Sequence, residues 1–400
     1  MNFCKKVHNA NYYASVESIP HEIWEQLHCD TNVYFSKAYL SSLAKHNEDI
    51  DFWYVILFDD EQIPVALSTI QIVNFYLDSV QNDLQSLIEW VKCIGRKLLI
   101  VSPEKPFKIL TCGNTFVSGE YGVFIKEGAN KHKVIKELSK SVVSFVTSEK
   151  QLDYKVNAFM LKDFEKESLA ISDELLEYNY HSFNVEPNMV MQIDGDWNNF
   201  QDYLAALKTK FRVKAKKAIE RSSTLEVLEI NASNISQYTE GIKKLYKNVS
   251  SKAGFNLGEF NIETYKTLKQ NLGEGYLINA YFLDGNLVGF LSAMVNQNSL
   301  DAHFVGIEYQ FNREYAVYQR MLYDYIDIAI KRKLSQINFG RTASEIKSSV
   351  GAVPQDLTIY LRHKKSIPNK ILSVFIKKIQ PTKFNQKFPF KAKETVVSGV

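Results

Sequence analysis

The chain has 400 residues, which exceeds one ordinary domain and suits two domains of about 150 to 200 residues each. Apolar residues make up 45% of the sequence and charged residues 23%, values that exclude a wholly disordered, collagenous or low-complexity chain. The formal net charge of +3 is too small for a protein whose whole surface is basic. We therefore expect a globular two-domain protein that does not bind DNA.

The positive charge is concentrated in two segments. Residues 208–221 hold seven Lys or Arg against one acid, Glu220, and residues 362–400 hold ten against one acid, Glu394. The rest of the chain is therefore acidic. Each basic segment suits contact with an anionic partner.

The cysteines lie in the first third of the chain and show neither a C-x-x-C pair nor a regular spacing, so we expect no disulfide framework and no metal site. They are Cys4, Cys29, Cys93 and Cys112. The N-terminus lacks the apolar stretch of a signal peptide, and the longest apolar run, Phe52 to Phe58, is far shorter than the ~20 residues that span a bilayer. We expect a cytoplasmic protein.

Strand and helix patterns alternate in the first half. Residues 52–58 and 63–73 are rich in β-branched and aromatic residues and flank a polar turn at 59–62, which predicts a hairpin. Apolar residues at helical spacing predict a helix over residues 131–150, and a strand is expected near residues 154–161.

The same order of elements recurs about 225 residues later. Residues 278–283 and 287–295 flank the turn Asp284-Gly285-Asn286, and a helix over 318–329 and a strand over 336–340 follow. We predict an internal duplication. The expected fold class is α/β, of the α+β kind with mixed β-sheets. The predicted domains are residues 1–177 and 178–362, followed by a basic tail over residues 363–400.

Further elements are expected in the second half. A strand is predicted over residues 187–193, one long helix over 198–220, and a second strand over 225–230. Two short helices are predicted over residues 236–249 and 262–272, and an amphipathic helix over 369–379.

Several segments resemble one known family. They are the basic helix with Leu207, Lys210, Arg212, Lys216, Lys217 and Ala218, the hairpin at 278–295, the run Asn338-Phe339-Gly340-Arg341-Thr342 with Glu345, Ile346, Lys347, Gly351 and Ala352, and the segment Cys112 to Glu120. The chain thus resembles the tandem-GNAT N-acyltransferases, the FemAB-like or BioF2-like acetyltransferase-domain proteins of bacteria. The resemblance covers most of residues 50–362. It implies two tandem GNAT-like (acyl-CoA N-acyltransferase) domains and acyl transfer to an amine.

The run Gly340-Arg341-Thr342 follows a predicted buried strand, where an α/β sheet exposes its carboxyl edge to ligands. Gly340 permits a close backbone approach, and Arg341 can bind a phosphate or carboxylate through two hydrogen bonds. Thr342 can cap the helix that contains Glu345 and Lys347. We predict that these five residues bind an anionic part of the donor or substrate. The structural alternative is a cap in which Arg341 pairs with Glu345.

The strand Leu300 to Glu308 is interrupted by Gly306, which predicts a bulge or the close approach of another backbone. The family resemblance implies that a free N–H of this strand faces the donor carbonyl and stabilises an oxyanion. The attacking ammonium, with a pKa of about 10, must also lose a proton. We predict His303 as the base, with Glu308 or Asp301 as its neighbour. A hydrogen-bonded structural histidine is the alternative.

The segment from Tyr309 to Tyr318 departs from the family pattern. Ordinary GNATs have a Q/R-x-x-G-x-G/A turn for the coenzyme A pyrophosphate, but this segment contains no glycine. An acyl-carrier protein or an aminoacyl-tRNA is therefore also considered as the donor. Asn312 and Arg313 are predicted to hold phosphate. Tyr318, or alternatively Tyr315, is predicted to protonate a departing thiolate, with core packing as the other interpretation of Tyr318.

The two basic segments are predicted to contact anions. Lys210 and Arg212 would neutralise the phosphates of a donor or a membrane, and a solvated lysine face is the alternative. Residues 364–393, with Phe384, Phe388 and Phe390, suit peripheral docking at the anionic inner membrane face. A disordered basic tail is the alternative.

We interpret the chain as a GNAT-superfamily N-acyltransferase without a permanently bound cofactor. Acyl-CoA or an acyl-carrier protein is the expected donor, and a small-molecule or lipid amine is the expected acceptor. The second domain is expected to carry catalysis and the first to narrow the cleft. A FemAB-type peptidoglycan transferase that uses aminoacyl-tRNA is less favoured, because residues 221–278 predict only short helices. A non-catalytic protein that binds envelope glycan or lipid is the other alternative.

Overall fold

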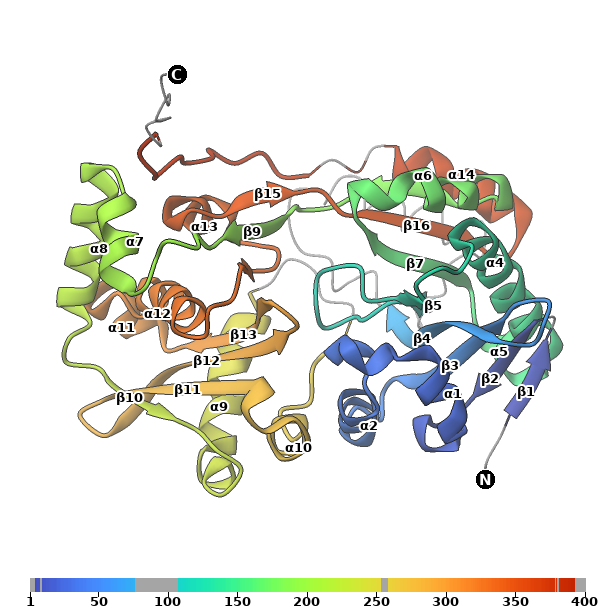
Figure 1. Ribbon diagram of the computed structural model, residues 1–400, viewed down its shortest axis with the longest axis horizontal. Helices are drawn as coiled ribbons and strands as arrows, with labels where there is room; N and C mark the ends of the chain where they lie inside the picture. The colour runs from blue at the N-terminus through green and yellow to red at the C-terminus, as the bar shows by residue number, and fades with distance from the viewer. Residues whose placement is uncertain are drawn as a thin grey trace, which may run out of the picture.

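The computed structural model describes residues 4–7, 9–75, 107–252, 258–377, 379 and 381–392 (Figure 1). These residues form two mixed β-sheets flanked by helices, which confirms the predicted fold class. In spatial order the first sheet contains β1 (Cys4–Val7), β2 (Ala10–Tyr13), β3 (Asp51–Phe58), β4 (Pro64–Phe75), β5 (Phe107–Cys112), β7 (Ala158–Phe164), β16 (Thr358–His363) and β8 (His181–Asn184), with β6 (Val123–Ile125) paired to β4. The second contains β10 (Glu226–Glu229), β11 (Tyr276–Leu283), β12 (Asn286–Asn296), β13 (Ser299–Ile307), β14 (Gln336–Asn338), β9 (Asn188–Gln192) and β15 (Val353–Gln355).

The two sheets repeat one topology. In each, a long hairpin, β3–β4 or β11–β12, is followed by a strand antiparallel to it, β5 or β13. That strand runs parallel to the next one, β7 or β14. The predicted duplication is therefore present in the strand order.

The halves also exchange strands. Between β7 and β8 of the first sheet lies β16, and between β14 and β15 of the second lies β9. The chain thus crosses from the first sheet to the second after residue 184 and returns after residue 355. The domain limits 1–177, 178–362 and 363–400 stay a prediction, and the first sheet contains strands from both sides of residue 178.

Helices cover both sheets. Those of the first half and the C-terminal segment are α1 (His21–Leu27), α2 (Lys37–His46), α4 (Lys131–Ser148), α5 (Lys150–Lys155), α6 (Leu169–Ser172) and α14 (Ser366–Ile376). Those of the second half are α7 (Phe200–Ala206), α8 (Thr209–Arg221), α9 (Ile235–Ser250), α10 (Thr264–Leu272), α11 (Tyr309–Tyr315), α12 (Val317–Lys331) and α13 (Ser344–Val350). Short 3-10 turns are η1 (Val16–Ser18), η2 (Cys29–Thr31), η3 (Val33–Phe35), η5 (Lys166–Ser168), η6 (Asp173–Tyr178) and η7 (Gly273–Gly275).

The core between the halves is continuous. On one face of the second sheet, α7, α8, α12 and α13 pack over a core centred on Met321 and Leu322. The opposite face packs on α9 and α10, and its core continues into η3 and α2 of the first half through Tyr34 and Tyr39. A site on this second face therefore lies between the two halves.

Two predicted elements differ from the structure. The single helix expected over 198–220 is two helices, α7 and α8, because Leu207 is extended and forms a β-bridge with Phe390. The strand expected near 154–161 begins later, at Ala158, because α5 occupies residues 150–155.

The last described residues are ordered against the second half. Residues 381–392, which we name the strap, run across the top of Figure 1 from α14 toward α8. The Lys208 N–H donates to the Pro389 carbonyl at 2.8 Å, and the ring of Phe390 packs near Trp197 and Tyr203. The alternative of a disordered tail is therefore wrong for these residues, while Lys378 and Lys393 lie outside the described residues.

Candidate active site

A bulge in β13 marks the predicted catalytic strand. His303 and Phe304 together oppose one residue of β12, Ser292. The Ser292 hydroxyl accepts a hydrogen bond from the Phe304 N–H at 3.1 Å and lies 3.2 Å from the Phe304 carbonyl, to which it donates. The predicted bulge is present, three residues before Gly306. The predicted close approach is also present, because a Cβ added to Gly306 would lie 2.7 Å from the Leu245 carbonyl carbon in α9.

Beyond its third residue, β13 separates from β14. The pairing covers Ser299–Asp301 against Gln336–Asn338, and β14 ends there. Among the described strands none pairs with residues 302–307 on that side. Backbone groups of this part of β13 are thus available to a ligand that enters between the strands.

The ring of His303 lies on the face of β13 that looks toward the first half. Its Nδ1 is 3.1 Å from the Tyr276 hydroxyl, and the ring packs against Phe260 and Phe304. The other ring nitrogen, Nε2, is buried and has no hydrogen-bond partner. Burial lowers the pKa of His303 to about 3, so the imidazole is neutral at physiological pH. Nε2 of this neutral ring is free of a protein partner, while the lowered pKa makes the ring a weaker base than a solvent-exposed imidazole.

Asp301 lies two residues before His303 and therefore on the same face of the strand. Its Oδ2 accepts hydrogen bonds from two tyrosines of the first half, at 2.7 Å from Tyr34 and 3.0 Å from Tyr121. Its Oδ1 accepts one from Ser299 at 3.2 Å. Burial raises the pKa of Asp301 to about 6, although these hydroxyl groups favour the charged form. Asp301 therefore titrates close to physiological pH where the two halves meet.

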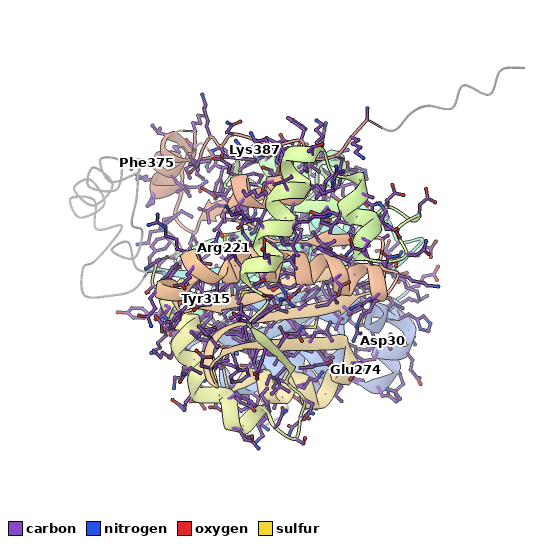
Figure 2. All side chains as sticks on the ribbon, turned by 90° about the vertical axis from the view of Figure 1, so that its left-hand side faces the viewer. Asp30, Arg221, Glu274, Tyr315, Phe375 and Lys387 are labelled. Atoms are coloured by element: carbon purple, nitrogen blue, oxygen red, sulfur yellow. The ribbon has the colours of Figure 1, made fainter. Side chains whose placement is uncertain are left out.

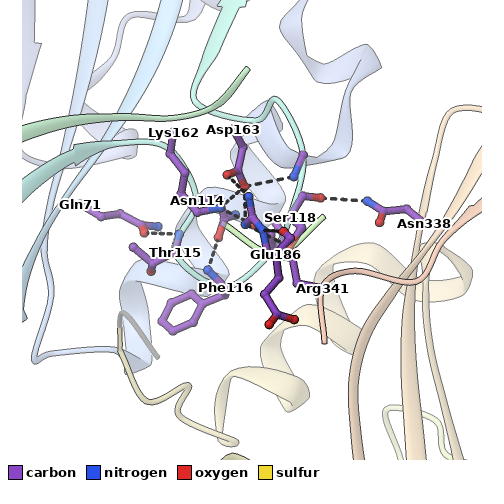
Figure 3. Close-up of polar contacts among 12 residues, drawn as sticks. Gln71, Asn114, Thr115, Phe116, Ser118, Lys162, Asp163, Glu186, Asn338 and Arg341 are labelled. Carbon is purple, nitrogen blue, oxygen red and sulfur yellow. Dashed lines mark hydrogen bonds and ion pairs between the residues drawn. The ribbon is translucent and has the colours of Figure 1, made fainter. Parts of the chain in front are cut away.

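The segments that carry the family resemblance meet in space (Figure 3). The Asn338 side chain donates to the Ser118 carbonyl at 2.8 Å, which joins the second half to the segment Cys112 to Glu120. Arg341 forms two hydrogen bonds to Asp163 of β7, at 2.5 Å and 3.1 Å, and a third to the Glu186 carbonyl at 2.9 Å. The contacts with Ser118 and Asp163 join the two halves.

The partner of Arg341 differs from both predictions for this residue. Its guanidinium binds a protein carboxylate, Asp163, which is fully buried, and Glu345 pairs instead with Lys387 of the strap at 2.8 Å. The alternative Arg341–Glu345 pair is therefore wrong. Burial opposes the ionisation of Asp163, but the charges of Lys162 and Arg341 outweigh it and hold its pKa below the usual value. Burial and the charge of Arg341 lower the pKa of Lys162.

Lys347 stabilises the turn that follows β14. Its ammonium donates to the carbonyls of Phe339, Gly340 and Arg341 at 2.8, 3.2 and 2.6 Å. Burial lowers the pKa of Lys347 to about 7. The prediction that Thr342 caps the next helix is wrong, because Thr342 and the N-cap residue Ala343 are both left-handed and α13 begins at Ser344 without a side-chain cap.

The glycine-free segment forms α11 and the start of α12. The Asn312 side chain accepts a hydrogen bond from the Tyr318 N–H at 2.9 Å. Asn312 therefore binds a backbone group in the first turn of α12. Arg313 is exposed, and Tyr318 is half-buried against the second core, where burial raises its pKa. Glu308 pairs with Lys244 at 3.2 Å. The structure does not bring Glu308 to His303, because five strand residues span about 16 Å.

The basic segments also meet. Lys210 is exposed on α8, while Arg212 donates to the Leu207 carbonyl at 3.2 Å. A surface pocket of about 530 Å³ separates Lys214 of α8 from Glu345 of α13 and Lys387 of the strap. Of the five residues predicted around Arg341, Glu345 is the one that lines this pocket.

Other reactive groups lie outside this arrangement. Cys29 and Cys112 are free and buried, and burial raises the pKa of each thiol to about 12, so neither is a thiolate at neutral pH. Cys93 lies outside the described residues. In the described part of the chain, no three His, Cys, Asp or Glu side chains gather as metal ligands. No helix within that part is long and apolar enough to cross a bilayer.

Sequence reasoning missed the residues that the first half contributes. Lys162 and Asp163 are adjacent charges inside a strand that is buried throughout, and such a pair in an apolar run is a detectable signal. Tyr34 and Tyr121 gave no such signal, because their partner Asp301 is distant in the sequence. Ser292 was also missed, because its function depends on the register of β12 against β13.

Solved structures share this fold. The chain is similar to FemX, with a TM-score of 0.53 and 11% identity over 90% of this chain and 99% of that one. It is similar to a tandem GNAT protein from the clavulanic acid biosynthesis pathway, with a TM-score of 0.50 and 6% identity over 86% and 94% of the two chains. For the C-terminal domain of a putative lysylphosphatidylglycerol synthetase from Agrobacterium fabrum, the TM-score is 0.48 and the identity 9% over 89% and 95%.

Comparisons at the level of sequence give no relative. No family model matches the chain, and no curated protein matches it. The structural likeness establishes the tandem-GNAT fold, as the resemblance to FemAB-like proteins predicted.

Proposed function

We propose that the chain is an N-acyltransferase that moves an acyl group from a thioester to a primary amine. The observation that carries the proposal is His303, which lies on a bulged strand between the two halves with a buried, unpartnered Nε2. The tandem-GNAT fold supports acyl transfer as the chemistry. Acyl-CoA or an acyl-carrier protein supplies the thioester, and no cofactor stays bound.

The reaction proceeds by direct attack. The amine nitrogen forms a bond to the thioester carbonyl carbon, and the carbonyl oxygen becomes an oxyanion stabilised by backbone N–H groups of β13. His303 donates its Nδ1–H to the Tyr276 oxygen and takes the proton of the attacking amine on Nε2. The C–S bond then breaks, and the thiolate takes a proton from Tyr318. Solvent returns a proton to Tyr318 and removes one from His303.

The neighbouring groups position these atoms. We assign Asp301 to the stabilisation of the imidazolium, because its carboxylate lies on the same strand face and is charged above about pH 6. Arg313 and Lys210 are exposed and bind phosphate of the donor. Asn312, Gly340, Arg341, Thr342 and Lys347 shape the surrounding turns, while Arg212 and Glu345 border the donor side.

The acceptor that we propose is a lipid amine at the inner membrane face. Support comes from α14, where Ile367 and Val374 are 73% and 52% exposed and lie beside Lys370 and Lys377. The strap offers less apolar surface to a membrane, because two of its three phenylalanines pack against the core of the second half. Vesicles with and without phosphatidylglycerol test the contact: the anionic vesicles should sediment the protein, and Ile367→Glu should abolish sedimentation.

The activity is tested directly with purified protein. Acyl-CoA, acyl-carrier protein and aminoacyl-tRNA are each incubated with small-molecule, amino-acid and lipid amines, and N-acylated products are detected by mass spectrometry. We expect an amide from a thioester donor, lost in His303→Gln. Amide formation from aminoacyl-tRNA alone would favour the second candidate, a FemX-type transferase, for which the likeness to FemX is the supporting observation. No product with any donor would leave the non-catalytic alternative.

A further inference from the structure

The exposed face of α8 combines charge with one apolar side chain. Lys210, Lys214 and Lys217 are exposed and follow an i, i+4, i+7 spacing, which places them on one side of the helix. Val213 is 58% exposed beside them. No acid of the described ranges forms an ion pair with any of these three lysines, so their charges are available to a partner.

This face adjoins the turn where a GNAT donor enters. The C-terminal end of α8 contacts the segment before α12, because Arg221 donates to the Glu314 carbonyl at 2.8 Å. Its N-terminal end meets the strap. Figure 2 looks onto this face, with α8 in front between Lys387 at one end and Arg221 and Tyr315 at the other. It lies on the α12 side of the second sheet, opposite to His303.

The segment over residues 309–318 lacks a set of free backbone N–H groups that could bind a pyrophosphate. Residues 309–318 contain no glycine, and the one left-handed residue among them, Ala316, carries a buried methyl group at the start of α12. The Tyr318 N–H at the start of α12 is already bound to Asn312. A donor that binds at another surface of the protein does not need a pyrophosphate site at this turn. A pantetheine arm attached to a carrier protein is such a donor, because contacts with the carrier protein supply the binding energy.

We propose that the face of α8 formed by Lys210, Val213, Lys214 and Lys217 docks an acidic acyl-carrier protein, whose pantetheine arm then reaches β13. This inference rests on the proposed acyl transfer. The residues from 210 to 217 extend about 11 Å, which matches two turns of one acidic helix. A single exposed valine between lysines suits a helix contact better than single-stranded nucleic acid, whose bases stack on aromatic side chains. This row of three lysines and one valine is also narrow compared with the surface that a bilayer contacts.

The experiment compares two charge reversals in full-length protein. Lys214→Glu/Lys217→Glu reverses two exposed charges of the proposed face and leaves Lys210, which is assigned to the donor phosphate, in place. Lys243→Glu/Lys247→Glu reverses an exposed i, i+4 pair on α9, on the opposite face of the same sheet. Binding of a bacterial acyl-carrier protein is measured by fluorescence anisotropy, and kcat/KM is measured with acyl-carrier protein and with the free thioester acyl-pantetheine.

We expect the α8 pair to weaken carrier binding and carrier-dependent kcat/KM at least tenfold at low salt, with less difference at high salt. The rate with acyl-pantetheine should not change, and the α9 pair should behave as wild type. Equal loss in both pairs, no carrier binding by the wild type, or a specific loss of tRNA or vesicle binding in the α8 pair would overturn the inference. Because binding is read without turnover, failure of catalysis alone would count against the proposed function instead.

Discussion

Strands β5 and β13 occupy equivalent places in the two halves but differ in regularity. Every residue of β5 pairs with β4 without a register shift, and β5 stays paired with β7 to its end at Cys112. Strand β13 has a bulge opposite Ser292 and loses its parallel partner after Asp301. The duplication thus preserved a closed strand in one half and an open one in the other. We infer that the open strand serves chemistry, whereas the closed strand leads into the segment that contacts the second half through Ser118.

The largest expected effect comes from removing the proposed base on the open strand. His303→Gln keeps a polar side chain of similar length but cannot take the proton, so kcat should fall by about 10²–10⁴-fold. Thr111→Val is the matched change on β5, where the hydroxyl is buried without a partner. It should leave both kcat and the unfolding midpoint unchanged. Steady-state kinetics and thermal unfolding of both variants test the difference, and full turnover by His303→Gln would contradict the assignment.

The junction between the halves is tested by Arg341→Ala. The change removes two hydrogen bonds to the fully buried Asp163 but leaves its ion pair with Lys162, so the free energy of unfolding should fall by about 2–3 kcal/mol. The exposed Arg313→Ala should change it by less than about 0.5 kcal/mol. Urea denaturation measures both. Unchanged stability of Arg341→Ala together with weaker donor binding would return Arg341 to the donor site.

We also expect kcat/KM to depend on pH through Asp301 of the open strand. The carboxylate of Asp301, with a pKa of about 6, stabilises the imidazolium only when ionised. Below about pH 6, kcat/KM should therefore fall by up to a further tenfold per unit, beyond the fall that protonation of the acceptor amine causes below its pKa of about 10. His303 stays neutral there, because its own pKa is about 3. Asp301→Asn should lower the rate and remove the additional fall below pH 6, while the fall that comes from the acceptor amine stays. An additional fall that persists in Asp301→Asn would assign the titration to another group.

Much of the fold was predictable from local patterns. The hairpins, the helix at 131–148 and the helical stripe of α12 follow from apolar periodicity, because burial of one face determines it. The break at Leu207 was not predictable, because it depends on a bridge to Phe390 in the distant strap. The exchange of β9 and β16 between the sheets likewise leaves no local signal.

The site was predictable in part. His303 and the interruption of β13 could be inferred from a histidine and a glycine within one strand. The partner of Arg341 could not, because Asp163 lies 178 positions away in the other half. From the sequence alone, either Asp301 or Glu308 could be the neighbour of His303. The structure separates them, because an even spacing keeps Asp301 on the same face while Glu308 pairs with Lys244.

The smallest expected effect concerns the strap, which packs against the half with the open strand. Phe390 is half-buried between Trp197 and Tyr203, and Gly351 leaves it room, because an added Cβ would lie 2.5 Å from its ring. Phe390→Ala should therefore lower the free energy of unfolding by about 1–2 kcal/mol. Phe388, 65% exposed two residues earlier, is the matched control and should change it by less than about 0.5 kcal/mol when replaced by alanine. Chemical denaturation measures the difference, and equal effects would mean that the strap does not stabilise the second half.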